Sequence, residues 1–285
     1  MKKLCMVLTA LFCLLTLLPA GAEAALVSVR GEARDGKVET ALKDARYRAV
    51  KKTLRMLINE DNNPNSIFQR ILADFERYCD RSAKPEGKRN TPQGLWVFTK
   101  VMVDEDAMAR EIKKLAGSVQ DKHADKAVYS LIRATGAKNN DAAAGVINRD
   151  FSSAFVRLGL ACEAGDSLQG FSAMAGGRTA VSAAEYERQV LQKLQTEWLE
   201  VGMALIGEVN VSTEALDNNG CLKKAVVNVK AVDLENNKVY CEYNRSYLRR
   251  GPTEADAETL VVQKAAIDMA EFLASETLKY WQNEN

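Results

Sequence analysis

Two turn signals in the last third of the chain separate three long runs of alternating apolar and polar residues. The turns are Asp217–Gly220 and Glu235–Lys238, and both are rich in the residues that favour tight turns. The runs that they separate are Met203–Thr213, Leu222–Leu234 and Val239–Leu248. Alternation with a period of two is typical of a strand with one buried face, and a short turn between two such runs predicts an antiparallel hairpin. We therefore expect this part of the chain to form an antiparallel sheet.

The remainder of the second half alternates between strand and helix patterns. A short strand is predicted at Ala127–Arg133 and a weaker one at Leu160–Glu163, and a glycine-punctuated loop follows from Gly165 to Gly177. Three predicted helices contain the apolar stripes Ile147 to Leu158, Val190 to Trp198 and Val262 to Leu273. This order of elements predicts an α/β domain, with a mixed sheet covered by amphipathic helices.

The first half predicts a smaller α+β module. An alternating strand at 26–31 precedes a helix of about five turns, whose buried stripe of Ala41, Ala45 and Ala49 would let it lie close to a sheet. The later elements are a helix from Ile67 to Phe75, strands at Tyr78–Lys88 and Gly94–Asp104, and a helix to Leu115 capped by Asp104. The predicted order is strand, helix, helix, strand, strand, helix.

A polar stretch between these two halves predicts a domain boundary. We expect a first domain at 25–116, a linker at 117–127 and a second domain at 128–285. Charge differs across the boundary, since residues 25–116 have 19 basic and 14 acidic side chains and residues 117–285 have 18 and 23. The halves either neutralise each other at a shared interface, which we favour, or face different partners.

The first 24 residues have the pattern of a secretory signal peptide. Lys2 and Lys3 precede an apolar run from Leu4 to Leu18, and Ala22 to Ala24 is a small-residue cleavage site. The run is shorter than the roughly 20 residues that a membrane-spanning helix needs. No small-residue box precedes Cys13, so we expect no lipid anchor. The mature protein is predicted to be periplasmic or secreted, and an association with the outer membrane is compatible with either.

Cleavage after Ala24 would leave four cysteines, namely Cys79, Cys162, Cys221 and Cys241. An oxidising compartment allows three pairings among them, but unpaired buried thiols remain an alternative. If the last turn is a hairpin, Cys241 lies opposite about Val232 and Cys221 lies near Gly251. The two cysteines would then be about 30 Å apart, which is too far for a disulfide. We therefore predict no particular pair.

The sequence contains no catalytic, metal-binding or nucleotide-binding signature. His123 is the single histidine, and it lies in the predicted linker, where we expect it to be solvated. The segment Gly165–Gly170 follows a strand but lacks the spacing of phosphate-binding and dinucleotide-binding loops. A formal net charge of +1 argues against nucleic-acid binding. We expect a protein that is not an enzyme and holds no cofactor or metal ion.

A basic helix face is the candidate contact site. The first long helix carries basic side chains from Lys43 to Arg55, and four of them are the residues that we would test: Arg48, Lys51, Lys52 and Arg55. They could bind an acidic partner, peptidoglycan or lipid headgroups. A solvated helix face is the competing interpretation, because amphipathic helices commonly have this composition.

Local patterns in the first half are similar to those of a known envelope module. The strand at 27–31, the helix segment at 41–50 and the aromatic strand at 95–103 resemble the N-terminal domain of flagellar assembly protein T, a module shared with lipoprotein-20-type envelope proteins. The segment at 203–209 and the hairpin at 229–239 resemble the α/β domain of the TolB N-terminal region, the curli-secretion channel protein and the penicillin-binding-protein activators. Gly31, Gly207 and Asp233 are interpreted as fold markers.

These resemblances imply a structural or assembly role in the cell envelope. The partners would be proteins of the flagellar basal body or of another outer-membrane-associated complex, and oligomerisation stays open. The chain departs from the activators and the curli channel because it has no lipobox cysteine. The alternative function is a periplasmic ligand-binding or regulatory module that uses the Gly165–Gly177 loop.

Overall fold

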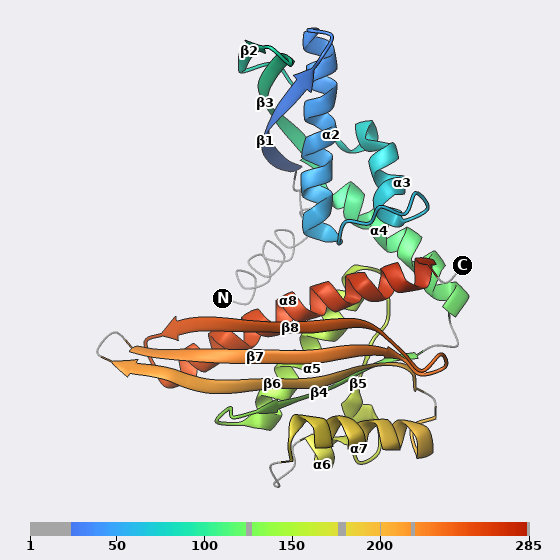
Figure 1. Cartoon of the computed structure of the whole chain (residues 1–285), viewed down its shortest axis with the longest axis vertical. Helices are drawn as coiled ribbons and strands as arrows, with labels where there is room; N and C mark the ends of the chain where they lie inside the picture. Colours follow the sequence, from blue (N-terminus) through green and yellow to red (C-terminus); the bar gives the residue numbers. More distant parts are fainter. Residues whose placement is uncertain (1–23, 124–126, 176–180, 200, 218–219, 284–285) are drawn as a thin grey trace, which may run out of the picture. The chain divides into compact units, whose positions relative to one another are not determined.

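The computed structural model describes residues 24–123, 127–175, 181–199, 201–217 and 220–283 (Figure 1). The chain divides into two compact units. The first contains the described residues up to Leu57 together with Arg70–Arg110, and the second contains Ile58–Gln69 and the described residues from Glu111 onward. Each unit combines a sheet with helices, as the sequence predicts. The segment of the predicted signal peptide lies outside the described residues, apart from Ala24.

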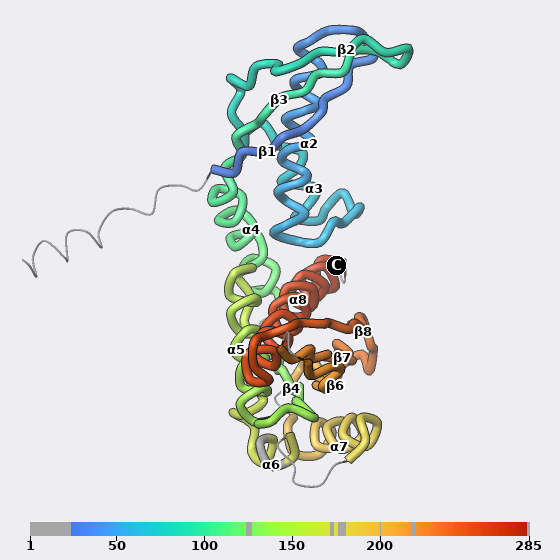
Figure 2. The backbone as a smooth tube through the Cα atoms, turned by 90° about the vertical axis from the view of Figure 1, so that its left-hand side faces the viewer, coloured from blue at the N-terminus to red at the C-terminus, as the bar shows by residue number. Residues whose placement is uncertain are grey.

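The first unit is an antiparallel three-stranded sheet with a long helix on one face. The strands are β1 (Ala24–Ala33), β2 (Gly87–Thr91) and β3 (Gly94–Asp104), in the order β1-β3-β2. Helix α2 (Val38–Leu57) packs against β1 and β3 and lies along one side of the sheet in both views (Figures 1 and 2).

Small side chains explain how closely α2 approaches the sheet. The predicted stripe of Ala41, Ala45 and Ala49 is fully buried. A Cβ atom on Gly31 of β1 would lie 1.8 Å from the Ala41 carbonyl oxygen and 2.8 Å from the Ala45 Cβ atom. Gly31 is therefore a packing residue, which agrees with its interpretation as a fold marker.

One predicted strand of the first unit is wrong. Residues 75–78 form a single 3-10 turn, η1 (Phe75–Tyr78), and Cys79 makes an isolated bridge to Val103. Regular pairing begins only at β2, because the polar residues between Cys79 and Gly87 offer no alternating apolar face. Two further helices, α3 (Ile67–Ala73) and α4 (Glu105–Gln120), each have residues in both units. Asp104 caps α4 as predicted, accepting a hydrogen bond of 2.8 Å from the Ala107 amide.

The second unit contains a mixed five-stranded sheet in the order β5-β4-β6-β7-β8. Its strands are β4 (Ala127–Thr135), β5 (Glu163–Ala164), β6 (Val201–Asp217), β7 (Gly220–Asp233) and β8 (Lys238–Gly251). Strand β4 pairs in parallel with β5 and β6, whereas β6, β7 and β8 form the predicted antiparallel meander. The predicted strand at Leu160–Glu163 shrinks to the two residues of β5.

Helices cover both faces of this sheet. Helix α8 (Glu254–Asn283) packs on β7 and β8 beside α5 (Asn140–Arg157), and the Trp281 indole donates to the Met203 sulfur at 2.9 Å. The neighbouring residue Ala204 instead joins a core with α6 (Phe171–Ala175) and α7 (Ala183–Thr196). Because successive strand residues point to opposite faces, α8 and α7 lie on opposite sides of the sheet.

The register of the β7–β8 hairpin agrees with the prediction to within one residue. Cys221 lies opposite Gly251, as expected, and Cys241 lies opposite Ala231, because a bulge shifts the register next to Val232. The four described cysteines are free thiols. Gly207 of β6 is again a packing residue, since a Cβ atom there would lie 2.1 Å from the Asn228 carbonyl oxygen.

The predicted linker and histidine environment need correction. Helix α4 continues through residues 117–120, and a 3-10 turn, η2 (Asp121–His123), follows it. Residues 124–126 of the predicted linker lie outside the described part. His123 is half-buried and its ring stacks on that of Trp281 at a centroid distance of 5.4 Å, so it is not a fully solvated side chain.

Candidate interaction surface

Strand β3 presents two different sets of side chains on its two faces. The residues that face α2 are buried: Leu95, Val97, Thr99, Val101 and Val103. The alternate residues, including Trp96, Phe98 and Met102, face away from the helix and are exposed or half-buried. We call the surface formed by Leu26, Arg30, Arg89, Trp96, Phe98 and Met102 the outer sheet face.

The strand register brings these six residues together. Leu26 lies opposite Met102, Arg30 lies opposite Phe98, and Arg89 of β2 lies opposite Trp96. Leu26 is 62% exposed, Met102 49% and Phe98 45%. Trp96 and Phe98 are neighbours on this face, and Leu26 and Met102 form a second pair on the far side of Lys100. Single exposed apolar side chains are normal on a protein surface, but several that share one face indicate an interaction site.

Two arginines flank the aromatic centre of the outer sheet face. The guanidinium carbon of Arg30 lies 4.1 Å from the centre of the Trp96 ring, and that of Arg89 lies 6.0 Å away. Arg30 also pairs with Glu32 at 2.7 Å, and Lys100, next to Phe98 on the same face, pairs with Glu86 at 3.1 Å. The first unit has 17 basic and 11 acidic side chains among its described residues, so its charge favours an acidic partner.

The predicted basic face lies on α2, where helical spacing places Arg48, Lys51, Lys52 and Arg55 on one side. Lys52 and Arg55 are exposed, and Arg48 is held by Asp44 at 2.8 Å. The Glu32 carboxylate oxygen that pairs with Arg30 also lies 3.5 Å from Arg48. Glu32 therefore links the basic helix face to the edge of the outer sheet face.

The alternative ligand site is filled by core side chains over its described part. Residues 165–175 form η3 (Gly165–Ser167) and α6, and Leu168 and Phe171 are buried in the core beneath α7. A Cβ atom on Gly165 would lie 2.7 Å from the Phe171 ring, so this glycine serves packing. Residues 176–177 of the predicted loop lie outside the described residues.

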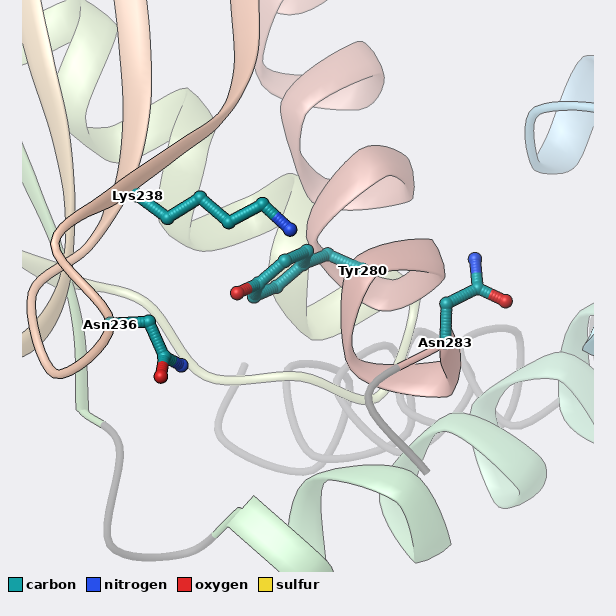
Figure 3. Close-up of a pocket in the computed structure, with 4 residues that line it drawn as sticks. All are labelled: Asn236, Lys238, Tyr280 and Asn283. Atoms are coloured by element: carbon teal, nitrogen blue, oxygen red, sulfur yellow. The ribbon is translucent and has the colours of Figure 1, made fainter.

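A separate half-open pocket lies at the tip of the β7–β8 hairpin. It has a volume of about 400 Å³ and is lined by Asn236, Lys238, Tyr280 and Asn283 (Figure 3). The first two residues belong to the turn and the start of β8, and the other two to the last turns of α8. The sequence indicated the turn, but it could not indicate that the end of α8 meets it.

Cysteine and metal chemistry have little support within the described residues. Burial raises the pKa of the Cys79 and Cys162 thiols and raises the pKa of Cys241 to about 11. These thiols are protonated at neutral pH and are weak nucleophiles. In the described part of the chain, no three His, Cys, Asp or Glu side chains are grouped to hold a metal ion. No helix there is long and apolar enough to cross a membrane.

Comparisons with known proteins identify no family. No protein-family model matches the chain, and no curated protein sequence matches it. One similar structure is the PelC dodecamer from Paraburkholderia phytofirmans, with 10% identity and a TM-score of 0.31 over 53% of this chain and 86% of that chain. Another is a putative lipoprotein from Caulobacter crescentus, with 9% identity and a TM-score of 0.28 over 60% of this chain and 97% of that one. At these scores neither structure identifies a function.

Proposed function

We propose that this protein is an exported, non-catalytic component of the bacterial cell envelope that works by protein–protein contact through the outer sheet face. The observation that carries the proposal is that Trp96 and Phe98 are neighbours on the outer sheet face and that Leu26 and Met102 form a second exposed apolar pair farther along the same face. Export is supported by the signal-peptide pattern of the first 24 residues. The location would be periplasmic or secreted, without a lipid anchor.

The composition of the outer sheet face is that of a protein interface. Tryptophan and arginine are enriched among the residues that dominate binding energy, and methionine and phenylalanine are enriched in interface cores. Burying apolar surface contributes roughly 25 cal/mol per Å². The sheet holds the backbone of these residues in place, so little backbone conformational entropy would be lost on binding.

The partner that fits this surface is an acidic protein segment with apolar side chains. Arg30 and Arg89 flank Trp96, and the first unit has an excess of basic side chains. The basic helix face of α2 would extend the contact through Glu32, so Arg48, Lys51, Lys52 and Arg55 stay candidate partner contacts. Association should weaken as the salt concentration rises, because exposed charges are screened.

We further propose that the contact belongs to an assembly role at the flagellar basal body or at another outer-membrane-associated complex. Support comes from the resemblance of residues 27–31, 41–50 and 95–103 to the N-terminal domain of flagellar assembly protein T. The flagellar role is tested by deleting the gene and measuring the motility of the cells. Loss of motility that the wild-type gene restores would support the flagellar role, and normal motility would remove it.

The contact itself is tested with a matched pair of variants. The partner is first identified by crosslinking in cells from a photoreactive residue at position 98, and its Kd for the purified chain is then measured. Phe98→Ser should weaken binding at least tenfold, whereas Met56→Ser on α2, where Met56 is 73% exposed, should leave the Kd unchanged. Both residues are exposed, so the melting temperature should stay the same. Equal Kd values for the two variants would contradict the proposal.

A further inference from the structure

The pocket at the hairpin tip is built on a buried carboxylate. Asp233, which is fully buried, accepts hydrogen bonds from the Asn236 backbone amide at 3.1 Å and from the Asn236 side-chain amide at 3.0 Å. The Tyr280 hydroxyl donates to the same carboxylate at 3.1 Å. Asp233 therefore fixes the position of two of the four lining side chains.

Aromatic stacking fixes the pocket wall further. The Tyr280 ring stacks on Tyr240 with a centroid distance of 4.4 Å, and the Tyr240 hydroxyl bonds with the Thr277 hydroxyl at 2.8 Å. One face of the Tyr280 ring is thus covered by Tyr240. The side chain of Lys238 reaches over the Tyr280 ring, as Figure 3 shows.

Lys238 supplies a cation that makes no ion pair with a carboxylate of the described residues. Its ammonium nitrogen lies 5.1 Å from the centre of the Tyr280 ring, and the side chain is exposed. Nearby, the side-chain oxygen of Asn283 accepts a hydrogen bond from the side-chain NH₂ group of Asn63. The NH₂ group of Asn283 therefore stays a donor. The pocket thus combines the positive charge of Lys238 with side-chain amide groups and the Tyr280 phenol, whose position is fixed by Tyr240 and Asp233.

We propose that this pocket binds an acidic sugar, with the sugar carboxylate on Lys238 and its hydroxyls on Asn236, Tyr280 and Asn283. Hydroxyl groups donate and accept hydrogen bonds, so they can pair with the side-chain amides and can donate to the Tyr280 oxygen, whose own proton goes to Asp233. The volume of about 400 Å³ lies within the usual range for small-molecule sites. Inorganic phosphate presents charge without the spread of hydroxyl groups that Asn236, Tyr280 and Asn283 could engage, so we expect it to bind more weakly.

The site is tested by titrating the chain from Ala25 to Asn285 and following backbone amide shifts by NMR. The probes are sodium glucuronate, glucose and inorganic phosphate. Glucuronate should give saturable shifts at Asn236 and Lys238 and bind about five- to tenfold more tightly than glucose, because a charge-assisted hydrogen bond is stronger than a neutral one. Phosphate should bind more weakly than glucuronate.

Two lysine variants decide whether the charge acts at the pocket. Lys238→Met should lower the affinity for glucuronate to that for glucose, whereas Lys224→Met, toward the other end of β7, should leave it unchanged. Both variants should keep the wild-type melting temperature. The proposal is overturned if glucuronate gives no saturable shift, if phosphate binds as tightly, or if Lys238→Met has no effect. It does not depend on the outer sheet face, which these variants leave intact.

Discussion

Gly31 lies where β1 packs against α2. Because it has no Cβ atom, it allows the strand and the helix to approach more closely than any other residue would. The space for its missing Cβ atom is taken by the Ala41 carbonyl oxygen and the Ala45 Cβ atom. Both neighbours belong to an ordered helix, and the carbonyl oxygen is backbone, so neither can move aside as a flexible side chain would. The alanine stripe and the glycine together set the spacing between helix and sheet.

Substitution of this glycine should therefore be costly. We expect Gly31→Ala to lower the free energy of unfolding by roughly 2–3 kcal/mol, since overpacking forces the backbone of α2 or β1 to shift. Gly87→Ala on β2 is the matched control, because its Cβ atom would lie at an ordinary 3.8 Å from the Phe98 ring. Urea unfolding followed by circular dichroism should show a change of less than about 1 kcal/mol for the control. Equal changes for both variants would contradict this account of the packing.

Among the elements, the long strands and their turns were the most predictable. Alternation in β7 and β8 continues for many residues and polar turn residues bound it, so the opposition of Cys221 and Gly251 follows from counting. The prediction for Cys241 differed by one residue because a bulge lies between Ala231 and Val232. A bulge depends on local packing and leaves no mark in the alternation.

Short or weakly patterned elements were less predictable. The five residues of α6 are too few to show a helical period, so the segment was expected to be a loop. The polar residues 117–120 suggested a linker, yet they continue α4. A strand is predicted at Tyr78–Lys88, but the polar stretch after Cys79 lacks the alternation of a strand with one buried face.

The outer sheet face could be predicted only in part. Both sets of side chains on β3 are largely apolar, so alternation alone cannot say which set faces a core. Lys100, which lies in the same set as Trp96 and Phe98, was the available signal, because lysine is almost never fully buried. The meeting of Leu26, Arg30 and Arg89 with this set depends on strand pairing and could not be read from spacing.

Strands β4 and β6 are joined by a nearly buried ion pair. The Arg133 guanidinium donates to one Glu208 carboxylate oxygen at 2.6 and 3.0 Å and to the Val181 carbonyl at 2.9 Å. It also lies 4.5 Å from the centre of the Tyr186 ring. The exposed fractions are 6% for the Arg133 side chain and 14% for that of Glu208. Removing one partner would therefore leave the charge of the other buried, with few water molecules to solvate it.

This pair should show strong energetic coupling. We expect Glu208→Leu alone to lower the free energy of unfolding by roughly 3–5 kcal/mol, because the buried arginine loses its counter-charge. The double variant with Arg133→Met should be much closer to the wild type, since apolar residues of similar size often replace a buried ion pair at little cost. A double-mutant cycle from urea unfolding measures this coupling. Additive single effects would mean that the two side chains act independently.

At the scale of the whole molecule, the chain contributes an early segment to the second unit before it completes the first. Residues 58–69 lie between two segments of the first unit in sequence but pack in the second. The Asn59 amide donates to the Ser275 hydroxyl at 2.8 Å, and the Ile67 amide donates to the Gln282 side chain at 2.9 Å. An amphipathic pattern shows that a segment has a buried face, but not which core receives it.

Two phenylalanines close together in sequence should consequently stabilise different units. Phe68 is buried and lines a small cavity with Leu278 of α8, whereas Phe75 packs edge-on against Tyr47 of α2 at a centroid distance of 5.5 Å. Removing a buried phenylalanine ring costs roughly 3–5 kcal/mol. Phe68→Ala should therefore speed hydrogen exchange in the last turns of α8, and Phe75→Ala should speed it in α2, with a smaller effect because that ring is half-buried.

Mass spectrometry of the exchanging peptides distinguishes the two effects. The peptide that covers residues 270–283 should lose protection in Phe68→Ala and keep it in Phe75→Ala, and the peptide that covers 41–54 should behave in the opposite way. If Phe68→Ala instead opened α2 and left α8 protected, residues 58–69 would belong with the first unit, and the predicted first domain at 25–116 would be continuous. If each variant opened only its own unit, the two cores would be stabilised separately, as their separate sets of contacts imply.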